Sequence, residues 1–286
     1  MLRRASSKGG LLARFDLGIR WTMGDVSPQG FEALRLSIWG AYRLFGARAS
    51  YLVCLNSMPI ERARARTGPL PPGVQWQDVT NAMPEHIRRH FDAGMAEGVA
   101  WKLAPLRCFP DRHELSLDND AILWSAPPAL TAWLEDTTAR SCLVAEDVRA
   151  CFGRFAEVCG DGPRNMGIRG LPPHFDLGKA LEDTLLGDGA PLSSELDEQG
   201  WQLAALQTSG KVHVVSVDDV TICSPFWPHR DSLGRCGAHF VGLNSRQLPW
   251  SYDGRPASEM TRENWERLKP AIYAHLDIAP WQEVAA

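Results

Sequence analysis

Two carboxylates, Asp118 and Asp120, stand at the end of a short apolar segment of the chain. Residues 114–117 are typical of a strand, and a second apolar stretch, residues 121–124, follows at once. Carboxylates near a core are costly unless a positive charge compensates them. A hard divalent cation that carries a phosphorylated ligand is well suited to compensate two acidic side chains. The position of the pair therefore predicts a metal site for a phosphorylated ligand.

An isolated pair of aspartates is a weak signal, because Asp or Asn after a strand is also ordinary turn chemistry. In an open parallel sheet, however, ligands collect beyond the carboxyl ends of the strands. At such an edge one carboxylate can bind a metal directly, while the other binds it through water or holds a ribose. A simple turn and a metal site both remain open from these residues alone.

Two later segments carry polar residues that a ligand can use. Asn165 and Gly167 lie at the start of a predicted strand, where a sugar ring can rest against the backbone or where the chain simply turns before an edge strand. Ser194 opens a predicted helix and forms a capping box with the acidic residue three positions later, which gives that residue a structural role. Glu198 and Gln199 are not explained by capping.

A third segment contains His239 and Gly242, followed by Pro249 and Trp250. A neutral imidazole at His239 can complete the ligand set of a metal, and a glycine lets backbone amides come close to a phosphate. A histidine beside apolar residues is also commonly a hydrogen-bonded core residue. Each of the three segments is a weak signal alone, and they indicate a ligand site only in combination with Asp118 and its neighbours.

These residues must be positioned by a mainly parallel sheet. The predicted strands occupy residues 18–23, 51–55 and 74–76, and a loop at 24–30 leads into a predicted helix at 31–45. Strand, helix and strand joined by short connections indicate parallel strands covered on both faces. The first half of the chain is therefore expected to be of the α/β class.

Beyond residue 80 the predicted strands and helices alternate less regularly. The expected elements are amphipathic stretches at 85–93 and 95–106, helices at 129–135, 146–155, 194–206 and 261–276, and strands at 166–171, 212–217 and 220–223. Thr261 is the predicted N-cap of the last helix. We expect a mobile N-terminal tail over residues 1–17 and a single domain over residues 18–286.

The composition of the chain argues against several classes of protein. The chain has 286 residues, of which 44% are hydrophobic, and this content supports a substantial core. Thirty basic and 34 acidic residues give a net charge of -4, which does not favour a protein that binds nucleic acid or coats an anionic membrane. Seven scattered cysteines without a C-x-x-C pair favour a reducing compartment. With no evident signal peptide or spanning segment, we expect a cytoplasmic protein, at most peripheral at a membrane.

The order of these motifs resembles that in the GT-A glycosyltransferases, and particularly in family 8, the group of glycogenin, galactinol synthase and lipopolysaccharide galactosyltransferase. Family members carry a basic residue on a helix, then L-D-x-D, N-x-G, an acidic helix start with Gln, and H-x-x-G followed by P-W. The matching residues here are Lys102, Leu117 to Asp120, Asn165 to Gly167, Asp197 to Gln199, His239 to Gly242, and Pro249 with Trp250. The resemblance covers roughly residues 18–250.

The resemblance implies a GT-A-like fold with a mainly parallel central sheet, flanking helices and a smaller antiparallel part on the acceptor side. It implies Mn²⁺ or Mg²⁺ as cofactor and a nucleotide-diphosphate sugar as donor, with a uridine diphosphate sugar favoured. By position, the implied metal ligands are Asp118, Asp120 and His239, and the implied catalytic residues near the transferred sugar are Asn165, Glu198 and Gln199. The implied donor contacts are Gly24, Asp78, Lys102, Asn119, Gly242 and Arg246.

Two departures from the family and two alternatives remain. The lysine that family members carry shortly after H-x-x-G is absent, which leaves Asn244 or Arg246 as candidate diphosphate partners, and Asp-Glu-Gln replaces the usual acidic-Gln-acidic order. A phosphotransfer or phosphatase-type α/β hydrolase would use Asp118 and Asp120 as nucleophile and acid/base. A catalytically silent protein would bind the nucleotide sugar without turnover. The acceptor, which can be a sugar, a lipid-linked sugar or a protein, and the oligomeric state are not predicted.

Overall fold

The structure is a computed structural model that describes residues 12, 15–92, 99–187 and 189–281. Most of the tail expected over residues 1–17, and part of the amphipathic stretch expected at 95–106, lie outside the described residues. The single domain expected from residue 18 onward remains a prediction.

The main sheet has seven strands in the order β3-β2-β1-β4-β7-β6-β8. They are β1 (Leu17–Met23), β2 (Ser50–Leu55), β3 (Val74–Asp78), β4 (His113–Leu117), β6 (Cys142–Glu146), β7 (Arg164–Leu171) and β8 (Val212–Val215). Strand β7 runs antiparallel to β4 and β6, and the other neighbouring pairs are parallel. The mainly parallel central sheet is therefore confirmed.

A second, smaller sheet has the order β5-β10-β9 and consists of β5 (Ala121–Leu123), β10 (Gly237–Phe240) and β9 (Val220–Cys223). Strand β10 is antiparallel to β5 but parallel to β9, so this sheet is mixed. A short antiparallel hairpin, β11 (Ser251–Tyr252) and β12 (Arg255–Pro256), follows it.

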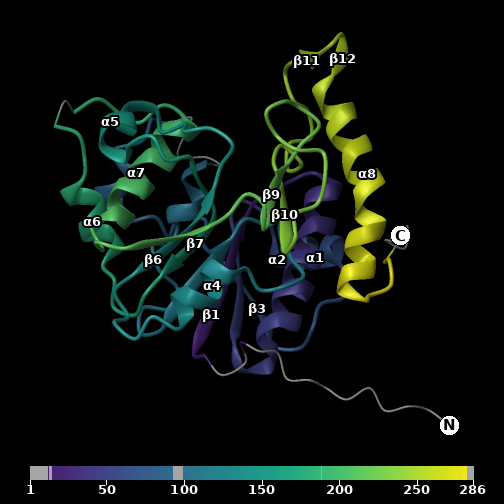
Figure 1. Cartoon of the computed structure of the whole chain (residues 1–286), viewed down its shortest axis with the longest axis horizontal. Helices are drawn as coiled ribbons and strands as arrows, with labels where there is room; N and C mark the ends of the chain where they lie inside the picture. The colour runs from purple at the N-terminus through teal and green to yellow at the C-terminus, as the bar shows by residue number, and fades with distance from the viewer. Residues whose placement is uncertain (1–11, 13–14, 93–98, 188, 282–286) are drawn as a thin grey trace.

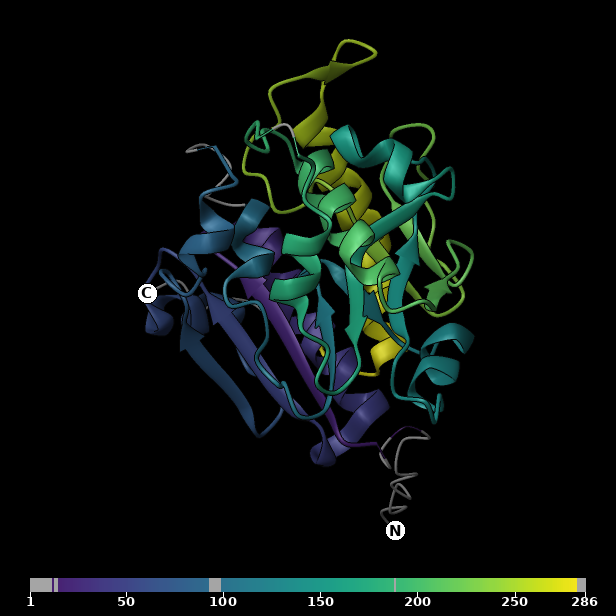
Figure 2. The ribbon, with the colours of Figure 1, turned by 90° about the vertical axis from the view of Figure 1, so that its left-hand side faces the viewer.

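Helices cover both faces of the main sheet. Figures 1 and 2 show α6 (Leu177–Asp183) and α7 (Glu195–Gln207) on one face, and α1 (Pro28–Phe45) and α8 (Ala257–Leu276) on the opposite side. The remaining helical segments are η1 (Gly46–Arg48), α2 (Ile60–Thr67), α3 (Glu85–Arg88), η2 (Val99–Leu103), α4 (Pro128–Leu134), η3 (Gly153–Phe155) and α5 (Ala156–Cys159). Among the described residues, no helix is long and apolar enough to span a membrane.

Strand β1 shows how the two faces are built. Ile19 and Trp21 point into the core shared with α1, where the periodic residues Leu34 and Ile38 pack. Side chains on a strand alternate between its two faces. Arg20 therefore projects to the face opposite to this core, where it is fully buried beside the 3₁₀ helix η2.

The helix predicted at 146–155 is wrong. The chain forms the strand β6 up to Glu146 and then turns, with only the short segments η3 and α5 beyond it. Residues 142–145 are all buried, so the strand shows no polar alternation that would have revealed it.

The predicted start of the last helix is also wrong. Helix α8 begins at Ala257, directly after Pro256, and Thr261 lies in its second turn instead of capping it. Helix α1 likewise begins at Pro28, earlier than predicted, with Ser27 as its N-cap. Helices α2 and α6 and strand β10 were not predicted.

Candidate active site

The expected site lies at the carboxyl edge of the parallel strands. Strands β1 and β4 are parallel neighbours, with Trp21 opposite Leu117, so Gly24 and Asp118 follow at the same edge. Because β7 is antiparallel to β4, its beginning reaches the same place, and the Asp118 amide donates a hydrogen bond to the Gly167 carbonyl at 2.8 Å. Three distant segments thus meet at one edge.

The small sheet brings His239 to the aspartates. In the antiparallel pair of β10 and β5, His239 stands opposite Ala121, and the Phe240 amide donates to the Asp120 carbonyl at 2.9 Å. As a result, His239 Nε2 lies 3.5 Å from Asp118 Oδ2 and 3.4 Å from Asp120 Oδ1. One possible ligand atom from each of the three residues lies within 4.8 Å of the others.

The donor set fits a divalent cation. Two carboxylates and an imidazole suit Mn²⁺, and carboxylate oxygens are the ligands that Mg²⁺ prefers. Asp120 and His239 are 3% and 5% exposed, and Asp120 Oδ1 accepts no hydrogen bond from any described residue. An acceptor left without a hydrogen bond in a buried place is the kind of atom that a cation satisfies.

The two carboxylates favour the protonated form of His239. Burial lowers the pKa of His239, but the Asp120 and then the Asp118 carboxylates raise it more, so the pKa lies above its usual value. A histidine must be neutral to bind a metal through its ring nitrogen. Metal binding at this cluster therefore competes with a proton on His239.

Lys102 supplies a second positive charge at the rim of the cluster. Its Nζ lies 2.8 Å from Asp118 Oδ2. Burial acts to lower the pKa of Lys102, but Asp118 and then Glu198 raise it above its usual value. The lysine is therefore a fixed cation next to the candidate metal ligands.

Buried arginines hold the backbone of Lys102 in place. Arg20 donates to the Lys102 carbonyl at 2.5 Å, and Arg169 approaches the same oxygen at 3.4 Å. Glu114, fully buried, lies 3.6 Å from Arg20 and accepts from the Cys108 and Phe109 amides. Burial and then Arg20 lower the pKa of Arg169 to about 10. A buried charge is tolerated only when it is paired or hydrogen-bonded, so this network fixes the position of η2.

A cavity of about 510 Å³ opens above the cluster. It is lined by most of the residues expected from the sequence: Gly24, Lys102, Asp118, Asn119, Asp120, Asn165, Glu198, Gln199, His239 and Gly242. This volume lies in the usual range for small-molecule sites.

Two expected donor contacts do not line this cavity. Asp78 is exposed at the end of β3, and its Oδ1 accepts from the Thr80 amide at 3.0 Å and from the Thr80 hydroxyl at 2.6 Å. These two hydrogen bonds lower the pKa of Asp78. Arg246 lines a neighbouring hollow and pairs with Asp25 at 2.5 Å.

The amides on the wall of the cavity are anchored to the backbone. Asn165 accepts from the Gly167 amide at 2.7 Å and donates to Asp147 at 3.0 Å. Gln199 donates to the Cys151 carbonyl at 3.0 Å and accepts from the Met166 amide at 3.4 Å. Their orientation is fixed in the ligand-free protein.

Glu198 lies behind these amides and is 2% exposed. Its Oε1 accepts from Gln202, and Gln202 in turn accepts from Arg169. Burial raises the pKa of Glu198 to about 7, although Lys102 acts to lower it. The carboxyl group is therefore partly protonated near neutral pH.

Asn244, which the sequence left as a diphosphate partner, faces the aspartates. Its Nδ2 donates to Asp120 Oδ2 at 2.9 Å and to Asn119 Oδ1 at 3.0 Å, and its Oδ1 accepts from Asn119 at 2.6 Å. Asn119 also donates to the Gly30 carbonyl at 3.0 Å. Asn244 thus joins the turn after β10 to the turn after β4.

Comparison with known proteins gives evidence about the fold. No protein-family model matches the chain, and no curated protein matches it. Among solved structures, the apo bifunctional glycosyltransferase WbbM is similar with a TM-score of 0.51 and 13% identity, over 92% of this chain and 52% of that chain. The chain has a GT-A-like fold.

The galactosyltransferase LgtC in complex with donor and acceptor sugar analogs is also similar, with a TM-score of 0.48 and 13% identity, over 92% of this chain and 97% of that chain. An active-site mutant of LgtC gives a TM-score of 0.48 and 14% identity, over 87% and 95%. The likeness to WbbM and the topology of the main sheet confirm the expected α/β GT-A-like architecture, while the roles of individual residues stay predictions.

Sequence reasoning missed Trp101 and Leu196, which also line the cavity. Trp101 packs so closely on Gly24 that a Cβ built there would lie 2.1 Å from its ring. Leu196 is 40% exposed in the first turn of α7. The chain has 11 tryptophans, and this high number was the only signal for Trp101; it does not distinguish a cavity wall from the core.

Proposed function

We propose that this protein is a metal-dependent glycosyltransferase that moves a sugar from a nucleotide-diphosphate sugar to an acceptor. The observation that carries the proposal is the meeting of Asp118 and Asp120, from the turn after β4, with His239, from β10, within 4.8 Å at one cavity. A GT-A-like fold places that cavity at the carboxyl edge of the sheet, where ligands of such sheets bind. The motif order favours a uridine diphosphate sugar as donor and Mn²⁺ or Mg²⁺ as the ion.

A divalent cation held by Asp118, Asp120 and His239 would offset the negative charge of the donor's diphosphate. The ammonium of Lys102, fixed beside Asp118, adds a second cation that stabilises the leaving diphosphate as the bond to the sugar breaks. Such preorganised charges act without reorganisation during the reaction.

The anchored amides of Asn165 and Gln199 are placed to orient the sugar toward an acceptor hydroxyl. Glu198 is a buried carboxyl group that lines the cavity, but its raised pKa and its hydrogen bond with Gln202 make it a weak nucleophile at neutral pH. We therefore propose transfer with retention by attack from the face of the leaving group, which needs no protein nucleophile.

The test is a panel of nucleotide sugars incubated with the protein, with Mn²⁺ or with EDTA, and assayed for release of the nucleoside diphosphate. Water can stand in as a slow acceptor, so the acceptor need not be known. We expect release from one nucleotide sugar only when the metal is present, together with metal-dependent thermal stabilisation by that nucleotide.

Two outcomes would overturn the proposal. Hydrolysis of phosphomonoesters with a phosphoryl group on Asp118 would identify a phosphatase-type enzyme. Metal-dependent nucleotide binding without any turnover, even with a broad mixture of sugar acceptors, would identify a binding protein.

A further inference from the structure

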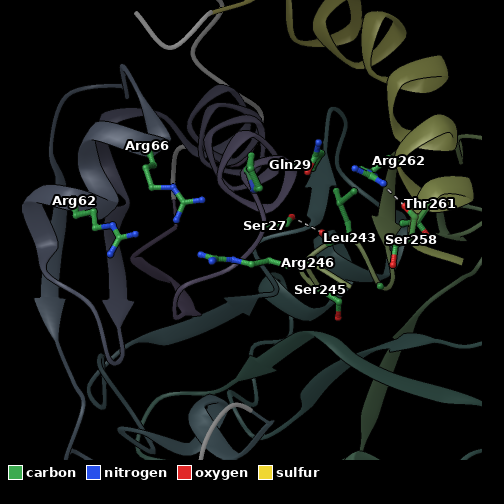
Figure 3. A pocket seen from close by; sticks show the side chains of 12 residues that line it. Ser27, Gln29, Arg62, Arg66, Leu243, Ser245, Arg246, Ser258, Thr261 and Arg262 are labelled. Atoms are coloured by element: carbon green, nitrogen blue, oxygen red, sulfur yellow. Dashed lines mark hydrogen bonds between the residues drawn. The ribbon is translucent and has the colours of Figure 1, made fainter. Parts of the chain in front are cut away.

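A second hollow of about 410 Å³ adjoins the first cavity, and Gly242 and Ser245 line both. Figure 3 shows its walls, to which α2, the start of α1, residues 242–246 and α8 contribute side chains. We call it the arginine hollow, because Arg62, Arg66, Arg246 and Arg262 line it.

The charge of the arginine hollow is only partly neutralised. Asp25 Oδ1 pairs with both Arg66, at 2.6 Å, and Arg246, at 2.5 Å, so one carboxylate serves two guanidinium groups. Among the described residues, no carboxylate forms an ion pair with Arg62 or Arg262. The hollow therefore keeps an excess of positive charge.

Acidic residues of α8 do not remove this excess. Glu259 and Glu263 lie near Arg262 on the surface of the helix, outside the lining of the hollow. Glu263 already pairs with Arg255 at 2.6 Å. Arg262 itself donates to the Ser258 carbonyl at 3.3 Å and remains exposed.

Two further features supply polar groups suited to an anion. The 18-residue helix α1 starts at the hollow with Ser27 as N-cap and has no acidic residue in its first turn, so its positive end is available. Thr261 lines the hollow and is 7% exposed, and its hydroxyl oxygen is buried without a hydrogen-bond partner among the described residues. A threonine inside a helix commonly bonds the carbonyl one turn before it. Thr261 is thus a buried polar group left for a ligand.

We propose that the arginine hollow binds the phosphate group of a second ligand. Guanidinium groups from α2, from the segment after β10 and from α8, a helix N-terminus and a hydroxyl surround one space, and phosphate has enough oxygens to accept from several directions. The hollow is large enough for the phosphate together with part of the molecule that carries it.

The position of the hollow indicates what this ligand does. Because Gly242 and Ser245 line both cavities, a phosphorylated molecule held in the hollow reaches the proposed donor site. Its assignment as the acceptor rests on the proposed transferase function, whereas binding of the phosphate does not.

The test is calorimetric titration of inorganic phosphate and of a hexose phosphate in EDTA, so that no metal-dependent binding contributes. We expect Arg62→Gln and Arg262→Gln each to weaken binding about tenfold, because each removes a charged hydrogen-bond donor. The matched control is Arg64→Gln on the same helix, which pairs with Glu61 at 3.3 Å and does not line the hollow. The three arginines are exposed, and thermal melting checks that each variant folds.

Vesicles containing a phosphomonoester lipid, compared with neutral vesicles, show whether the phosphate comes from a lipid headgroup. Binding of either source that falls in Arg62→Gln and Arg262→Gln but not in Arg64→Gln supports the proposal. Absence of binding by the unaltered protein to both sources, or equal loss in all three variants, overturns it.

The sugar-release assay is independent of this result. If phosphate binds as expected but no nucleotide sugar is turned over, the transferase proposal fails while the hollow stands. If turnover occurs and the arginine variants bind phosphate normally, only the hollow proposal fails.

Discussion

Two adjoining cavities share Gly242 and Ser245 but differ in the charge that they present. The first holds two aspartates and a histidine that suit a cation, and the second holds four arginines that suit an anion. A short turn after β10 separates a cavity with a cluster of acidic side chains from one lined by basic side chains. The difference teaches that a negatively charged cavity and a positively charged cavity can lie next to each other when different helices and strands supply the charged side chains of each.

The largest expected effect comes from removing one acidic ligand of the first cavity. Asp118→Asn keeps the shape of the side chain but removes its charge, and we expect Mn²⁺ affinity and sugar release to fall by more than about 100-fold, since changes even outside the ligand set cost about 10–100-fold. Titration with Mn²⁺ and the release assay measure this. Asp161→Asn, in an exposed loop, is the control. Unchanged metal affinity in Asp118→Asn would place the cation elsewhere.

Crowding of the imidazole should have the next largest effect. A Cβ at Gly167 would lie 2.4 Å from His239 Cε1 and 2.6 Å from Nδ1, so Gly167→Ala must displace the ring. We expect metal affinity to fall about 10–100-fold, with a loss of about 1–3 kcal/mol in the free energy of unfolding. Gly187→Ala is the matched control, because nothing lies within 4 Å of its added Cβ. Equal metal affinity in both variants would argue against His239 as a ligand.

Glu198 makes the first cavity sensitive to pH. Its pKa is raised from 4.5 to about 7 in the folded protein, chiefly by burial. Below about pH 4.5 the group is protonated in both states and costs nothing; as pH rises, the unfolded state releases its proton first, so stability is lost until pH passes about 7. The loss between about pH 5 and pH 7 is about 2 kcal/mol.

Glu198→Gln cannot ionise and should not show this loss. We expect the free energy of unfolding of the variant, relative to the unaltered protein, to increase by about 2 kcal/mol between about pH 5 and pH 7 in urea titrations without metal. Parallel pH profiles for the two proteins would show that the carboxyl group titrates normally.

The smallest effect is expected at the wall between the cavities. Asn244→Ala removes the hydrogen bonds to Asn119 and Asp120, leaving buried polar groups without partners. We expect metal affinity to fall about tenfold and the free energy of unfolding to fall by about 1–3 kcal/mol. Asn81→Ala, at an exposed turn, is the control. A drop in stability without any change in metal affinity would mean that Asn244 only supports the fold.

The sequence predicted the first cavity well, because its residues lie in short motifs at strand ends. Asp118 and Asp120 follow β4 directly, and His239 comes to them through the pairing of β10 with β5, which the order of motifs implied but no local pattern specified. Strand β6 was not predicted, since a strand buried on both faces has no alternation to reveal it. The helix predicted at 146–155 falls almost entirely on the turn and the 3₁₀ segment that follow this strand.

The arginine hollow was not predicted from the sequence. Arg62 and Arg66 stand on α2, a short helix whose exposed, arginine-rich sequence gives almost no apolar pattern. Arg246, expected at the donor's diphosphate, instead pairs with Asp25, and Arg262 comes from α8 at the far end of the chain. A site assembled from single residues on separate elements leaves no motif, so only their arrangement in space shows it.

The most direct test of the central claim is a crystal structure with Mn²⁺ and a uridine diphosphate sugar, in which anomalous diffraction locates the manganese. The account predicts one ion bound by Asp118, Asp120 and His239 and in contact with the diphosphate. A nucleotide bound in the cavity without an ion at these three residues, or an ion elsewhere in the molecule, would contradict it.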